Sequence, residues 1–193
     1  VRLSAELDLA IDPDTAELAR RDAGLAAAPA GERQRAELER ILLSRDPVDG
    51  LRRLDDLGLL AVVLPEVKAL DGVEQNRYHH FDVLDHTLQV LDAAIDLSEH
   101  PEFAFGAAAP AVAAALAEEL DGDVDVALAV RWGALLHDIA KPTTQRTFDD
   151  GHIGFPGHAQ EGADMAMAIL GRLRCSTALQ RCVAVLVREH LRL

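Results

Sequence analysis

The sequence predicts an all-α fold: a helical bundle that carries a small β-hairpin and an N-terminal helical extension. Ala, Leu and Arg, which favour helices, dominate its 193 residues. Aromatic residues make up only 4%, and alternating runs of β-branched residues are scarce. Hydrophobic residues make up 49% and recur at helical spacing between Pro and Gly breaks. This composition is enough to bury a sizeable core in one domain with a small extension.

The first third of the chain carries short helical patterns, at residues 14–23, 32–45 and 46–57. In the last of these, Pro47 follows Asp46 at the first helical position, and Gly58 is placed to cap the C-terminus. We therefore predict a helical extension over residues 1–65 and a core domain over residues 66–193.

The core domain carries stronger helix signals. Asp82 is placed to cap a helix that runs to about Leu97, and Pro110 to open a short helix. The turn sequence Asp149-Asp150-Gly151, between two short β-capable runs, predicts the hairpin. Three further helices are expected at residues 124–139, 157–171 and 177–192.

Three acidic residues lie close together in Asp121-Gly-Asp123-Val-Asp125. Paired carboxylates at this spacing can hold magnesium when they lie on a strand. Because these residues precede a predicted helix, we interpret them as N-capping residues.

The charge and the cysteines exclude several classes of function. The formal net charge of -14 argues against binding of nucleic acid or an anionic membrane by the surface as a whole. Phosphate chemistry would need a local positive centre, either a metal ion or a few placed Arg and Lys.

Cys175 and Cys182 form no CxxC pair, so neither a disulfide framework nor a cysteine zinc site is predicted. With no apolar run long enough for a membrane span and no signal peptide, we expect a cytoplasmic protein.

Four of the eight histidines lie on apolar stripes of four different predicted helices. A single histidine on such a stripe is usually a core residue with a hydrogen-bond partner. Four buried imidazoles would each need a partner, and a metal ion satisfies several at once. The stripes are His86 with Val83 and Val90, His137 with Val130 and Ala134, His158 with Gly162, Met165 and Ile169, and His190 with Leu179, Val183 and Leu186.

Two further residues complete this candidate centre. Asp138 follows His137, and its carboxylate could bridge two ions. Lys141 lies three residues later, either as a cation that complements the helix dipole or as a contact to a phosphate oxygen beside the metal.

A second cluster precedes the helix that starts after Asp82. His79 and His80 lie at its N-terminus, where backbone amides favour an anion, and Arg77 could add a bidentate grip on a phosphate. The alternative is a polar loop with surface histidines.

The order of His86, His137-Asp138 and Lys141 resembles the HD-domain metal-dependent phosphohydrolase superfamily, and the stretch WGALLHDIAKP is close to its central motif. More specifically, residues 64–91, 131–166 and 174–193 resemble the HD region of bacterial CCA-adding tRNA nucleotidyltransferases. Residues 1–15 and 31–67 resemble the segment that enters the helical neck of these enzymes and the neck itself. The palm domain of these enzymes has a Gly-Ser followed by an Asp-x-Asp pair on a strand. The chain shows no such combination, so we expect no nucleotide addition.

The resemblance implies an all-helical HD domain with a neck-like extension and one or two divalent ions, of Fe, Mn, Co, Ni or Mg. His86, His137 and Asp138 would hold the first ion. His158 and His190 match two further positions of the superfamily and would hold a second ion, with Asp138 as the bridge. The superfamily also uses a late Asp ligand, for which the chain shows no clear equivalent.

We therefore expect a phosphohydrolase that acts on phosphomonoesters or cyclic phosphodiesters, with nucleotides as its small phosphorylated substrates. Asp138 and Lys141 are its predicted catalytic residues, and Arg77, His79 and His80 its predicted substrate contacts. We expect no membrane partner and no tight tRNA binding by this chain alone. Two alternatives stay open: a fragment of a tRNA nucleotidyltransferase-like protein that positions RNA, and an inactive HD scaffold.

Overall fold

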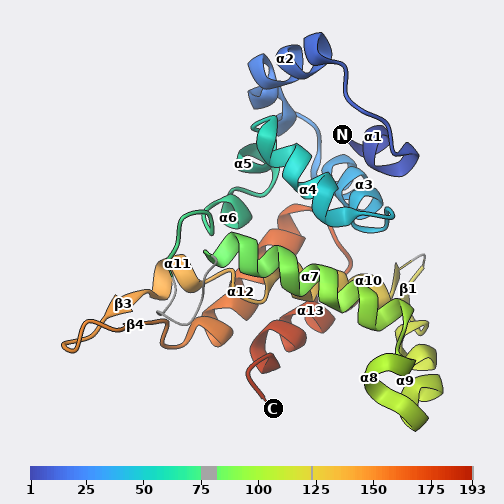
Figure 1. Cartoon of the computed structure of the whole chain (residues 1–193), viewed down its shortest axis with the longest axis vertical. Helices are drawn as coiled ribbons and strands as arrows, with labels where there is room; N and C mark the ends of the chain where they lie inside the picture. The colour runs from blue at the N-terminus through green and yellow to red at the C-terminus, as the bar shows by residue number, and fades with distance from the viewer. Residues whose placement is uncertain (75–81, 123, 193) are drawn as a thin grey trace.

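The structure is a computed structural model that describes residues 1–74, 82–122 and 124–192. In these ranges the chain is helical apart from two short antiparallel strand pairs (Figure 1), which confirms the predicted all-α class. The N-terminal helices are α1 (Arg2–Leu7), α2 (Pro13–Arg21), η1 (Ala23–Ala27), α3 (Gly31–Leu42), α4 (Pro47–Asp56), α5 (Leu60–Val63) and α6 (Pro65–Lys68). The later elements are α7 (Val83–Glu99), α8 (Glu102–Phe105), η2 (Gly106–Ala108), α9 (Ala109–Leu116), β1 (Glu119–Asp121), β2 (Val124–Asp125), α10 (Val126–Leu136), α11 (Lys141–Thr144), β3 (Arg146–Thr147), β4 (Ile153–Gly154), α12 (His158–Arg172) and α13 (Thr177–Glu189).

The caps of α4 and α7 follow the sequence signals. The Asp82 carboxylate accepts a hydrogen bond from the backbone of Asp85 at the start of α7. Gly58 follows α4 with a φ of 69°, a left-handed conformation that glycine adopts at little cost. The amide of Gly58 donates to the Asp55 carbonyl and that of Leu59 donates to the Leu54 carbonyl, which is the Schellman pattern of hydrogen bonds.

The prediction of a helix over residues 124–139 is wrong at both ends. Val124 and Asp125 form β2, which pairs with β1, and the turn between them contains Gly122 with a φ of 58°. The helix therefore begins after Asp125, whose side chain caps it. It ends at Leu136, where i→i+3 hydrogen bonds replace the α-helical pattern. Asp121 is thus a strand residue and not an N-cap, and Asp123 lies outside the described residues.

Helix α10 is the central element of the core. It packs against α7 on one side and α13 on the other, and α12 packs against α13. Trp132, on α10, is fully buried in the hydrophobic cluster. Figure 1 shows α7 crossing the molecule, with α8 and α9 at one end and the β3–β4 hairpin projecting at the other. No helix in the described ranges combines the length and the apolar character of a membrane span.

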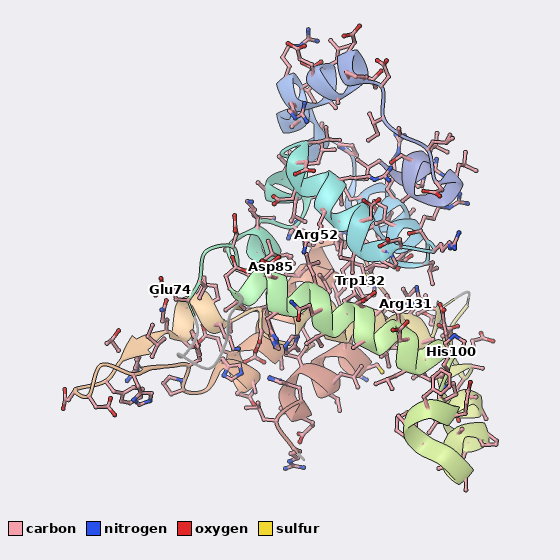
Figure 2. The ribbon with its side chains drawn as sticks, in the orientation of Figure 1. Arg52, Glu74, Asp85, His100, Arg131 and Trp132 are labelled. Carbon is pink, nitrogen blue, oxygen red and sulfur yellow. The ribbon has the colours of Figure 1, made fainter. Side chains whose placement is uncertain are left out.

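The N-terminal helices dock on this core through ion pairs and one close backbone approach. Arg172, at the end of α12, binds the Val63 carbonyl and the Glu66 carboxylate. Arg52 of α4 lies 3.1 Å from the Asp85 carboxylate of α7 (Figure 2). Gly31 begins α3 so close to α12 that a Cβ at this position would lie 2.2 Å from the Arg172 carbonyl oxygen. The boundary between residues 65 and 66 stays a prediction.

We predict that Gly31→Ala destabilises the chain by about 1–3 kcal/mol, because the added methyl group would collide with a backbone atom and separate α3 from α12. Urea unfolding followed by circular dichroism measures the change. Gly24→Ala is the matched control: no atom lies within 4 Å of a Cβ there, so its unfolding midpoint should change little. Equal stability of the two variants would contradict the close approach.

Candidate metal centre

The centre of the candidate site is the carboxylate of Asp138, which is only 2% exposed. It lies just after the end of α10, and five side chains from the ends of α7, α10, α11, α12 and α13 surround it. These are His86 in the first turn of α7, His137 at the C-cap of α10, Lys141 at the start of α11, His158 at the start of α12 and His190 at the C-cap of α13. The structure thus brings together five residues that the sequence analysis singled out with Asp138.

The two carboxylate oxygens of Asp138 face two different pairs of histidines. Oδ2 lies 3.0 Å from Nε2 of His137 and 3.6 Å from Nε2 of His86. Oδ1 lies 3.4 Å from Nε2 of His158 and 3.7 Å from Nε2 of His190. His86, His137 and Asp138 form one group of potential metal ligands, and Asp138, His158 and His190 form a second. Asp138 therefore has the position of a bridge between two adjacent sites.

Local backbone contacts fix the orientation of three of these imidazoles. Nδ1 of His137 lies 2.8 Å from the Ala134 carbonyl oxygen, and Nδ1 of His190 lies 2.6 Å from that of Val187. Nδ1 of His158 is likewise 2.7 Å from the carbonyl oxygen of Phe155. A carbonyl oxygen only accepts, so each Nδ1 must carry the proton. In the neutral rings, Nε2 is then a lone-pair donor that faces the carboxylate.

This donor set fits a divalent metal. Nε2 of His158 and Nε2 of His190 lie 3.3 Å apart, and in neutral rings they are two acceptors with no proton between them. A cation held by both nitrogens removes this conflict. Two ligands that each lie about 2.1 Å from one ion are roughly 3.0–3.4 Å apart at ordinary coordination angles, which is close to the separations seen around Asp138. The protein therefore holds a group of histidines and one aspartate that could bind an ion.

The electrostatic balance keeps Asp138 ionised. Burial alone would raise the pKa of this carboxyl, but the contacts with His137, His158 and Lys141 outweigh it and hold the pKa far below its usual range. In the metal-free centre a protonated imidazole can donate from Nε2 to this carboxylate. The same contact with Asp138 raises the pKa of His158, whereas burial lowers the pKa of His190. A negative charge is thus permanently present between the four imidazoles, where it favours a cation.

Lys141 contributes the one ammonium group within this cluster. Its Nζ lies 2.7 Å from Asp138 Oδ2 and 5.2 Å from the centre of the Phe155 ring. The side chain is buried, so water screens its positive charge only weakly. The interpretation of Lys141 as a simple helix C-terminal cation does not fit, because the residue begins α11 and points at Asp138.

The other residues that the sequence analysis considered have separate outcomes. Arg77, His79 and His80 are outside the described residues, so their role as substrate contacts stays a prediction. His152 is exposed and stacks on Phe148. Burial raises the pKa of the Cys175 thiol to about 12, which fits a packing residue.

The sequence analysis missed the cavity beside the centre. Its volume is about 420 Å³, and His137 and His190 form part of its wall. The sequence did contain an indication of this cavity, because four of its other lining residues lie on the same apolar stripes as the histidines. These are Val90, Val130, Ala134 and Leu186. The full lining is Val90, Val130, Gly133, Ala134, His137, Leu186 and His190.

Comparisons with known proteins agree with the resemblance. The model of the HD domain family matches residues 83–193, and a family described as "Probable RNA and SrmB- binding site of polymerase A" matches residues 8–70. The chain is 33% identical to an A-adding tRNA nucleotidyltransferase of Deinococcus radiodurans over 98% of its length. It is 37% identical to a CC-adding tRNA nucleotidyltransferase of Thermus thermophilus over 99%. A bifunctional uridylyltransferase/uridylyl-removing enzyme of Novosphingobium aromaticivorans is 32% identical over 98%.

The matched region is a part of each relative. The chain spans 39% and 40% of the two tRNA nucleotidyltransferases and 19% of the uridylyltransferase. The HD-family match covers more than half of the chain and includes all five histidine and aspartate residues of the candidate centre. HD domains bind divalent metals, in agreement with the donor set around Asp138. By this match and by its helical core, the chain belongs to the HD-domain family.

Proposed function

We propose that the chain is a metal-dependent phosphohydrolase that acts on phosphomonoesters or cyclic phosphodiesters of nucleotides. The observation that carries the proposal is the buried Asp138 carboxylate, each oxygen of which faces a pair of imidazole nitrogens. This arrangement suits two adjacent cations, and adjacent cations suit a phosphoryl group, whose oxygens are negative. The name of the uridylyl-removing relative adds support, since removal of a nucleotidyl group is cleavage of a phosphate ester.

The chain's own residues have distinct roles in this proposal. His86, His137 and Asp138 hold one ion, and Asp138, His158 and His190 hold the other. The ions, of Mn, Fe, Co, Ni or Mg, supply Lewis-acid polarisation of the phosphoryl group and a water molecule of lowered pKa. Asp138 bridges the ions, and Lys141, beside Oδ2, places an ammonium group next to a phosphate oxygen.

The number of ions is directly measurable. We expect elemental analysis of the chain, loaded with manganese and dialysed, to give up to two ions per chain. The double variant His158→Ala/His190→Ala should retain at most one ion, because only the ligands around Oδ2 remain. His152→Ala, an exposed histidine outside the centre, is the control and should keep the full content. If the double variant bound as many manganese ions per chain as the unchanged protein, His158 and His190 would be core histidines and not metal ligands.

Hydrolysis of p-nitrophenyl phosphate tests the reaction. We expect a slow turnover that a chelator abolishes and Mn, Co, Ni or Fe restores. Asp138→Ala should lose metal and activity together, whereas Lys141→Ala should keep the metal and lose roughly 10²-fold or more in rate. Lys68→Ala is the matched control, because Lys68 pairs with Asp55 and Asp71, which are outside the centre. Full activity of metal-free protein in excess chelator would contradict the proposal. An unchanged rate of hydrolysis in Lys141→Ala would show that Lys141 has no part in the reaction.

A second candidate function is the positioning of RNA by the N-terminal helices. The family match over residues 8–70 and the names of the two tRNA-modifying relatives favour it. The arginines of this segment argue against it, since most of them have acidic partners in the structure. The pairs are Arg21–Asp22, Arg35–Glu39, Arg40–Glu6, Arg52–Asp85 and Arg53–Asp49. The net charge of -14 also argues against RNA binding, because it repels the phosphate backbone.

A gel-shift experiment with tRNA at physiological salt separates the two functions. We expect at most weak binding that disappears as salt is raised, because few unpaired cations are available to displace counterions from the RNA. A sub-micromolar affinity that persists at physiological salt would favour the RNA-positioning function over the phosphohydrolase. The binding should be measured with and without manganese, since a metal-dependent affinity would locate the RNA phosphate at Asp138 instead of at the N-terminal helices.

A further inference from the structure

The cavity of about 420 Å³ beside the candidate centre has the size of a small-molecule site. Three helices form its walls. Val90 comes from α7, Val130, Gly133 and Ala134 from α10, and Leu186 from α13. Its remaining lining residues are His137 and His190, which belong to the candidate metal centre.

The position of the cavity relates it to both candidate ions. His137 is one of the pair that faces Asp138 Oδ2, and His190 is one of the pair that faces Oδ1. Their rings lie edge to face, with centroids 5.2 Å apart. A ligand in the cavity would therefore touch one histidine from each pair, so the cavity borders both groups of potential metal ligands, although Asp138 itself does not line it.

The chemistry of the walls defines what the cavity can accept. Among the lining residues, which all lie in the described part of the chain, only the two histidines have polar side chains. Both donate through Nδ1 to a backbone carbonyl and direct Nε2 at Asp138. The walls thus present aliphatic groups and imidazole rings, with no side chain free to read a pattern of hydrogen bonds.

Gly133 fixes the shape of one wall. A Cβ at this position would lie 3.0 Å from Cδ1 and 3.1 Å from Cβ of Leu186. The absence of a side chain lets Leu186 lie directly against α10. Leu186 and Val185 follow each other on α13, but only Leu186 lines the cavity, and Val185 is 54% exposed.

From this geometry we propose that the cavity receives the aromatic ring of a phosphate ester whose phosphoryl group lies at Asp138. A ring gains apolar contact with Val90, Val130 and Leu186 and edge contact with the imidazoles. The inference rests on the proposed phosphohydrolase function and specifies its substrate class: phosphate esters of aromatic-ring compounds, selected by the ring and not by its hydrogen-bonding groups. Hydrolysis places the oxygen of water on phosphorus, breaks the P–O ester bond and returns a proton to the departing alcohol oxygen.

Two non-hydrolysable probes test the ring site without requiring turnover. Calorimetry on the manganese-loaded chain compares phenylphosphonate with methylphosphonate, which share the phosphonate group and differ only in the apolar part. We expect phenylphosphonate to bind roughly tenfold more tightly or better, because its ring leaves water. Equal affinity overturns the ring site and leaves the proposed function standing if metal-dependent hydrolysis persists. Failure of both phosphonates to bind, together with failure of hydrolysis, overturns both.

Matched variants locate the ring. Val130→Trp fills the cavity and should bring the ratio of the two dissociation constants close to one, with the methylphosphonate constant unchanged. Val185→Trp, the same change at an exposed position outside the cavity, should keep the ratio. Leu186→Ala removes one wall and should reduce the ratio several-fold, which keeps the inference testable if Val130→Trp does not fold. If Val130→Trp and Leu186→Ala fold and leave the ratio of the two dissociation constants unchanged, the ring does not bind in this cavity.

The four nucleoside 5′-monophosphates distinguish a ring site from a base-reading site. Because none of the described residues that line the cavity has a side chain free to pair with a base, kcat/KM should agree within about tenfold across adenine, guanine, cytosine and uracil. A larger preference for one base would overturn selection by the ring alone. Similar values for phenyl phosphate and the nucleotides would show that the ring suffices, whereas faster nucleotides would place the ribose in the site as well.

Discussion

The structure depends on one constraint, the burial of a carboxylate that stays charged. Moving such a group out of water is costly unless opposite charge or hydrogen bonds compensate it. Lys141 supplies one positive charge at 2.7 Å, and four imidazoles complete the surroundings. The ends of α7, α10, α11, α12 and α13 must therefore meet at Asp138. The packing of these helices and the geometry of the site depend on each other.

Helix termini are well suited to this task. The last carbonyl groups of a helix have no partner within the helix. His137 and His190 each lie at a helix C-cap and use Nδ1 to bind the carbonyl three residues earlier. This bond satisfies an orphan acceptor and directs Nε2 at Asp138. Local backbone contacts thus orient the nitrogens that could bind a metal ion, as preorganised sites require.

The sequence predicted the members of this centre better than its boundaries and its surroundings. Histidines on four apolar stripes predicted convergence because apolar faces must pack together, and His86, His137, His158 and His190 do meet at Asp138. The β1–β2 pair was not predicted, because a three-residue strand carries almost no periodicity and depends on its partner. The cavity could not be predicted either. Its walls come from α7, α10 and α13, and their spacing is set by tertiary contacts such as Gly133 against Leu186.

The proposed function requires an acidic protein to bind a phosphate ester. With a net charge of -14, long-range attraction is unfavourable, so affinity must arise at short range. The N-terminal arginines do not supply it, since contacts such as Arg52–Asp85 and Arg40–Glu6 use their charge to dock helices. Arg52 binds the residue directly before His86, so the N-terminal segment supports the first helix of the centre. Under the proposed function, the positive charge would come from the ions held around Asp138 and from Lys141, which lies 2.7 Å from its carboxylate.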